Sequence, residues 1–167
     1  MNVSFLAPEL GKWDMLDAAQ APEALVLPFF ADERPLRGAA GLCDWRLCGR
    51  LSRLIARDRL DGDWGETTLY PPGARLPFPR IVLFGLGPQD RFDEARAREA
   101  ARKILSVIER LAVRRYALAP PGRSTGRLSA RRALELFLDE AKGKLSGELV
   151  IVESPAGQKE AAELARR

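Results

Sequence analysis

The strongest constraint on the fold is a short apolar run at positions 81–84 that ends in a turn containing Gly85 and Gly87. Four consecutive β-formers without polar alternation are typical of a strand buried on both faces, as in a parallel sheet with helices on either side. The glycines permit a sharp turn at the carboxyl end of this strand, where open α/β sheets usually place a ligand crevice. The run therefore predicts an α/β fold with a candidate site at this sheet edge.

The rest of the chain alternates between strand and helix patterns. We expect further strands at 2–6, 24–30, 66–70, 115–118 and 148–152, with 81–84 and 149–152 inside the sheet. Pro28 predicts that the second strand ends at an edge or a bulge. We expect helices at 36–59, from a cap at Asp90 to Leu111, after a cap at Ser129, and at 156–167. The pattern predicts one domain over 1–167, with a mainly parallel or mixed six-stranded sheet and helices on both faces.

Composition excludes several kinds of chemistry. The chain contains no histidine, the commonest general base and metal ligand, so a hydrolase triad is excluded. A metal site built only from carboxylates stays possible, but the Asp and Glu residues are scattered mostly along predicted helical faces, where a solvated surface is favoured. We expect no catalytic residues, metal or cofactor. Cys43 and Cys48 lie about 140° apart on the predicted helix, which makes a bridge between them or a shared metal unfavourable. The sequence shows neither a signal peptide nor an apolar run of about 18 residues, which favours a soluble cytoplasmic protein without a membrane segment.

Two glycine-containing turns are candidate ligand sites. The turn with Gly85 and Gly87 reads Gly-x-Gly-x-x-Asp, so it lacks the third glycine of the dinucleotide fingerprint, and Pro88 removes a backbone donor. A plain strand-to-helix turn is the favoured interpretation there. The loop at 122–127 is the better candidate for binding an anion, because it combines flexible backbone amides, two hydroxyls and two guanidiniums ahead of a helix. Its residues are Gly122, Arg123, Ser124, Thr125, Gly126 and Arg127.

The segment from Arg110 to Arg132 is unusually basic. It holds seven arginines and no acidic residue, in a chain whose 27 Lys and Arg against 23 Asp and Glu give a net charge of +4. This excess permits anionic partners without requiring them, and a solvated surface loop is the simpler interpretation. Trp45 lies off the apolar stripe of its helix, and together with Trp13 it predicts an exposed patch that marks a protein contact. For Trp64 and Trp45, core or interface packing is favoured over stacking on a base.

Several segments, taken in order, resemble the N-terminal domain of the leucyl (cytosol) aminopeptidases of the M17 family. The matching pieces are the strands at 24–30 and 80–87, the turn at 62–67, the helix around 98–102 and the closing segment at 161–166. The resemblance implies a macro-domain-like α/β fold that contributes to assembly and regulation, while a separate C-terminal domain holds two metal ions. The family's catalytic run, Asn-Thr-Asp-Ala-Glu-Gly-Arg, does not occur here. No residue of this chain therefore receives a catalytic or metal-binding role from the resemblance.

Three functions follow as hypotheses. The first is a non-catalytic, aminopeptidase-associated domain for protein interaction, assembly or regulation, whose partner is another copy of the chain or a peptidase subunit. The second is a binder of ADP-ribose or another phosphorylated small molecule, which macro-like folds bind through such loops. The third is a nucleic-acid-binding accessory domain that uses the arginine-rich segment. Whether the chain stands alone or is part of a longer aminopeptidase stays open in the sequence.

Overall fold

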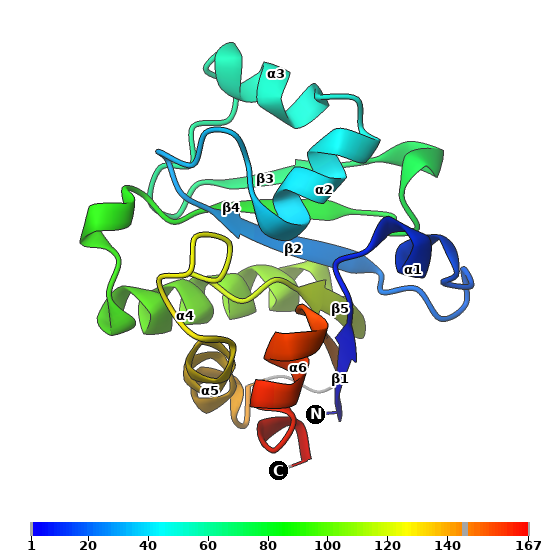
Figure 1. The fold of residues 1–167 in the computed structure, drawn as a ribbon, viewed down its shortest axis with the longest axis vertical. Coiled ribbons are helices and arrows are strands. Elements are labelled where there is room, and N and C mark those ends of the chain that lie inside the picture. The colour runs from blue at the N-terminus through cyan, green and yellow to red at the C-terminus, as the bar shows by residue number, and fades with distance from the viewer. Residues whose placement is uncertain (1, 145–146, 167) are drawn as a thin grey trace.

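In the computed structural model, residues 2–144 and 147–166 are described, and their six strands form one mixed sheet in the order β1-β6-β5-β2-β4-β3. Neighbouring strands are parallel except for β3, which runs antiparallel to β4 at one edge (Figure 1). The predicted α/β class, the strand positions and the interior places of β4 and β6 are confirmed. The strands are β1 (Asn2–Leu6), β2 (Ala24–Phe29), β3 (Thr67–Tyr70), β4 (Ile81–Gly85), β5 (Arg115–Leu118) and β6 (Glu148–Val152).

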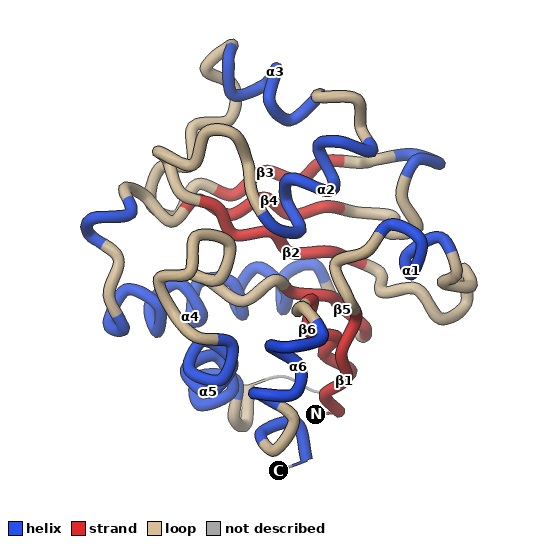
Figure 2. The backbone as a smooth tube through the Cα atoms, in the orientation of Figure 1, coloured by secondary structure: helices blue, strands red, loops and turns tan. Residues whose placement is uncertain are grey.

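Helices cover both faces of the sheet, as Figure 2 shows. The helices α1 (Leu10–Asp14), α2 (Gly38–Arg46) and α3 (Arg50–Ala56) pack on one face. The helices α4 (Glu94–Leu111), α5 (Ala130–Ala141) and α6 (Pro155–Ala161) pack on the other. Short 3₁₀ turns lie at Gly73–Arg75, Gln89–Arg91 and Leu164–Arg166.

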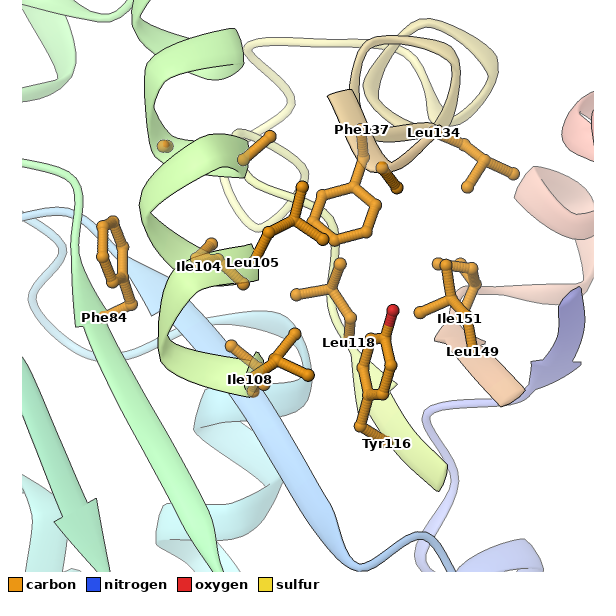
Figure 3. Packing of buried hydrophobic residues seen from close by; sticks show 14 of the residues in the cluster. Phe84, Ile104, Leu105, Ile108, Tyr116, Leu118, Leu134, Phe137, Leu149 and Ile151 are labelled. Carbon is orange, nitrogen blue, oxygen red and sulfur yellow. The ribbon is translucent and has the colours of Figure 1, made fainter. Parts of the chain in front are cut away.

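The larger core cluster lies between the sheet and the helices α4 and α5. Figure 3 shows Ile104 and Ile108 of α4 and Phe137 of α5 packed over the strand residues Tyr116 and Leu118. Along β2, alternate side chains enter opposite clusters, because successive residues of a strand point to opposite faces. Burial on both faces of the sheet thus explains why these strands are apolar at successive positions. The apolar run at 81–84 predicted this burial.

The prediction of a single helix at 36–59 is wrong, because the chain forms two helices there. Cys48 and Gly49 have left-handed backbone angles, with φ of 56° and 74°, and end the first helix. The carboxylate of Asp44 then accepts hydrogen bonds from the amides of Leu51 and Ser52, at 2.8 and 3.1 Å, and so caps the second. The apolar spacing carries on across the break, which is why periodicity alone missed it.

Three smaller predictions also need correction. The cap of α4 is Asp93, whose side chain accepts from the Arg96 amide at 2.8 Å, whereas Asp90 lies in the preceding 3₁₀ turn. Pro28 lies in an interior strand, but beyond the last registered pair of β2 with β5, so its missing N–H removes no bond of that ladder. The predicted final helix ends at Ala161 and is followed by a 3₁₀ turn, while residue 167 lies outside the described part of the chain.

Candidate functional site

A cleft of about 210 Å³ opens at the carboxyl ends of β2, β5 and β6. Leu27, Ala119 and Val152 contribute apolar wall, and the amino end of α2 forms another side. Two residues of the predicted anion loop, Arg123 and Ser124, also line it. The cleft lies at the strand ends where parallel sheets place ligands, but neither β4 nor its glycine turn contributes to the lining.

The turn at 85–87 uses its own amides within the chain. Gly85 and Gly87 donate to carbonyls of the 62–66 turn at 2.8 and 2.9 Å, and Leu86 donates to the end of β2 at 2.9 Å. A Cβ at position 85 would lie 2.6 Å from the carbonyl carbon of Gly62, so only glycine fits. The amides of this turn are thus hydrogen-bonded within the chain, and Gly85 packs closely against the 62–66 turn. The assignment of Gly85 and Gly87 to a ligand site stays a prediction.

Arg123 is held by a buried carboxylate. Its Nε and Nη2 atoms donate to the two oxygens of Glu153 at 2.7 and 3.0 Å, and its Nη1 donates to the carbonyl of Leu128 at 3.1 Å. Glu153 follows β6 directly and also accepts from the amide and hydroxyl of Ser154. Burial acts to raise the pKa of Glu153, but the hydrogen bonds from Arg123 and Ser154 lower it below its ordinary value.

Ser124 is held by a second buried carboxylate, that of Glu33. The Ser124 hydroxyl donates to Glu33 at 3.0 Å, and the amides of Phe30 and Arg37 donate at 3.1 and 3.0 Å. Burial raises the pKa of Glu33, and these hydrogen bonds oppose the rise. Sequence reasoning missed both carboxylates, although an acidic residue shortly after an apolar strand was the signal available for each.

The remaining loop residues have different surroundings. The hydroxyl oxygen of Thr125 is buried and has no hydrogen-bond partner among the residues described. Arg127 is exposed and does not line the cleft. Gly122 and Gly126 both have left-handed backbone angles, with φ of 83° and 72°, and shape the loop. The structure thus brings two of the six predicted loop residues to the cleft.

The arginine-rich segment is largely neutralised by acidic residues from elsewhere in the chain. Four of its seven arginines form ion pairs within the described residues: Arg115 with Glu148, Arg123 with Glu153, Arg131 with Glu163, and Arg132 with Glu94 and Glu135. Most of these pairs are partly exposed, so each contributes little to stability. Their main effect is to cancel positive charge that the sequence alone left unbalanced.

The tryptophans divide into three environments. The prediction that Trp13 is exposed is wrong: it is fully buried in α1, edge-on to Phe78 at 5.4 Å between ring centroids. Its indole nitrogen finds a partner in the carbonyl of Ala7, at 2.9 Å. Trp64 is half-buried beneath the guanidinium of Arg96, 4.3 Å from the ring centre. Trp45 is 73% exposed, which confirms its predicted place on the surface.

Within 2–144 and 147–166, no group of three or more His, Cys, Asp or Glu is placed to hold a metal ion. No helix in this same part of the chain has the length and apolar character needed to cross a membrane.

The sequence model of the cytosol aminopeptidase family, N-terminal domain, matches residues 26–159. A probable cytosol aminopeptidase of Picosynechococcus is 31% identical over 94 residues, which is 55% of this chain and 19% of that protein. A probable cytosol aminopeptidase of Burkholderia orbicola is 33% identical over 79 residues, covering 47% of this chain and 16% of that protein. The chain thus spans about a fifth of the length of these relatives.

Solved structures show the same fold. The Trypanosoma brucei macrodomain in complex with ADP superposes with a TM-score of 0.69 at 15% identity, over 97% of this chain and 68% of that one. A mutant of tomato leucine aminopeptidase superposes with a TM-score of 0.61 at 13% identity, over 99% of this chain and 35% of that one. The macro-domain-like fold that the resemblance implied is therefore confirmed.

Proposed function

The chain belongs to the cytosol aminopeptidase family through its N-terminal domain, and on this premise we propose that it is a non-catalytic interaction module whose partner is a peptidase subunit of that family. The matched region is the N-terminal domain alone, and the 94 residues aligned with the Picosynechococcus relative are 19% of that protein. The part of such a relative that lies beyond its N-terminal domain is therefore the natural candidate for a partner, either on the same polypeptide or as a separate subunit. The names of the relatives favour a cytosolic location.

The observation that carries this proposal is the exposure of two large apolar side chains, those of Met15 and Trp45, near the ends of α1 and α2. Trp45 is 73% exposed and Met15 is 80% exposed. Their sequence neighbours Arg46 and Asp14 form an ion pair at 2.8 Å, which joins the two helices. A large aromatic side chain presented on fixed helices is typical of the anchor residues that dominate protein interfaces.

The two alternatives have less support. For a phosphorylated ligand, the favourable observation is the cleft with Arg123 and Ser124, but both of these residues already donate to carboxylates. For nucleic acid, the favourable observation is the run of arginines, but four of the seven are paired within the chain. Positive charge that is already balanced contributes little to binding of a phosphate backbone.

The test uses the Burkholderia orbicola relative from which the matched N-terminal part has been removed, after its folding has been checked by circular dichroism. Sedimentation velocity of the mixture should show a saturable complex with this chain. Replacement Trp45→Ser should weaken the complex by on the order of tenfold or more, as the loss of an interface anchor does. The matched control is Leu69→Ser, which removes an exposed side chain from β3 and should leave binding unchanged.

Two outcomes contradict the proposal. The first is the absence of any complex, or a complex that the Trp45→Ser variant forms as well as the parent. The second is an isolated chain that forms its own dimer through Trp45, which would assign the surface around Trp45 to a second copy of the chain instead.

A further inference from the structure

The cleft at the ends of β2, β5 and β6 is lined by groups that commonly hold anions, and two of them, Arg123 and Ser124, already donate to carboxylates of the chain. We propose that it is an anion site whose donors Arg123 and Ser124 are occupied by the chain's own carboxylates, Glu153 and Glu33, which exclude phosphorylated ligands from it. This inference goes beyond the proposed interaction function and does not depend on it.

The first half of the site surrounds Glu33. Two backbone amides, of Phe30 and Arg37, and the hydroxyl of Ser124 converge on its two oxygens at 3.0–3.1 Å. Backbone amides and a hydroxyl directed at one point are the donors with which loops hold phosphate oxygens. Glu33 is 2% exposed, so its carboxylate fills this position rather than pointing into solvent.

The second half surrounds Glu153. The Arg123 guanidinium meets this carboxylate through two nitrogens, at 2.7 and 3.0 Å, and the Ser154 amide adds a third donor at 2.9 Å. A guanidinium offers this same fork to carboxylates and to phosphates. Glu153 is 6% exposed, and the lowered pKa keeps it charged at neutral pH.

The two halves meet at consecutive residues of one loop. Arg123 and Ser124 both line the cleft, and each donates to a different buried carboxylate. A phosphorylated ligand in the cleft would have to take these donors while standing beside charges of its own sign. Like charges at close range in a partly buried site repel strongly, because the protein interior screens them less than water does.

The test measures binding of inorganic phosphate and of ADP by titration calorimetry. The parent should bind neither. Replacement Glu153→Ala frees the Arg123 guanidinium and should create saturable phosphate binding. Any residual binding of phosphate by the parent should be at least tenfold weaker. The double variant with Arg123→Ala should lose this binding again. The control is Glu163→Ala, which frees the surface Arg131 away from the cleft and should bind no phosphate.

A second variant tests the other carboxylate, Glu33, through the thermal unfolding midpoint. Replacement Glu33→Ala leaves its three donors without an acceptor, which lowers the thermal unfolding midpoint. Formate, a carboxylate without a side chain, should raise that midpoint by more than it raises the parent's. If Glu153→Ala does not fold, Glu153→Gln gives the same comparison, because a neutral amide leaves the guanidinium charge unbalanced.

The proposal is overturned if the parent binds ADP as tightly as the Glu153 variant does. It is also overturned if a folded Glu153 variant binds no more phosphate than Glu163→Ala, or if formate stabilises Glu33→Ala no more than the parent.

Discussion

Replacement Gly85→Ala should destabilise the domain strongly, because the end of β4 packs directly on the preceding turn. A methyl group at this position would lie 2.6 Å from the carbonyl carbon and 2.8 Å from the carbonyl oxygen of Gly62, and closer still to the Asp63 carbonyl oxygen. Backbone atoms cannot yield as a flexible side chain does. The 62–66 turn therefore has to move away from the strand.

That movement breaks contacts whose worth can be added up. Gly65 donates to the carbonyl of Gly85 at 2.9 Å, and Gly85 donates to the carbonyl of Glu66 at 2.8 Å. Two such bonds contribute about 1–3 kcal/mol together. Overpacking of a well-packed interior costs about 1–3 kcal/mol more. The expected loss is therefore about 2–6 kcal/mol, a large part of the roughly 5–15 kcal/mol by which a domain is stable.

Urea unfolding followed by far-UV circular dichroism measures this loss. With a slope of about 2 kcal/mol per molar urea, a loss of about 3 kcal/mol moves the midpoint down by roughly 1.5 M. The control is Gly11→Ala in α1, where a Cβ meets nothing within 4 Å. Alanine there should be neutral or stabilise by up to about 1 kcal/mol, because it favours helix. A loss below about 1 kcal/mol for Gly85→Ala would refute the close-packing argument.

Four further predictions concern individual side chains. Replacement Asp44→Ala removes the carboxylate that caps α3 and should cost about 1–2 kcal/mol in urea unfolding. Cys48 is exposed and should react with a thiol reagent at once at pH 8, whereas Cys43 should react only on unfolding, because burial raises its pKa to about 12. The lowered pKa of Glu153 stabilises the fold above pH 4.5 and this contribution is lost as pH falls, so Glu153→Gln should flatten the acid side of the stability profile. The raised pKa of Glu33 acts in the opposite sense. Its contribution to the stability of the fold is present below pH 4.5 and is lost as the pH rises through the pKa of the folded state. The Glu33→Gln variant should therefore lose less stability than the parent as the pH rises through this range.

The strands could be predicted from the sequence because their signal is local. The runs that form β4 and β6 are apolar at nearly every position, and the residues that bound them include Pro or Gly. Burial on both faces of a parallel sheet requires such runs, so composition over five residues already decides the assignment. The signal that predicted Ser129 as the cap of α5 was equally local. The cap is confirmed, because the Ser129 hydroxyl accepts a hydrogen bond from the Arg132 amide at 3.1 Å.

The break between α2 and α3 was harder to predict because two signals conflicted there. The apolar spacing continues from Cys43 through Leu47 to Leu51, and all three side chains are buried. Gly49 was the contrary signal, since a glycine in a left-handed conformation is the usual end of a helix. The core needs these apolar positions in either arrangement, so their spacing could not distinguish one helix from two.

The chemistry of the 122–127 loop could not be predicted, because it depends on which acceptors reach its donors. The acceptors of Arg123 and Ser124 are thirty and ninety-one positions away in the chain, and only the folded sheet brings them to the loop. A guanidinium already paired with a buried carboxylate can take an anion only after that carboxylate leaves, whereas a free one needs no such exchange. Arg127 is exposed, but it lies outside the cleft, where salt screens any attraction it exerts. The residue types therefore indicated an anion site, and the pairing of those residues determines whether an anion can enter it.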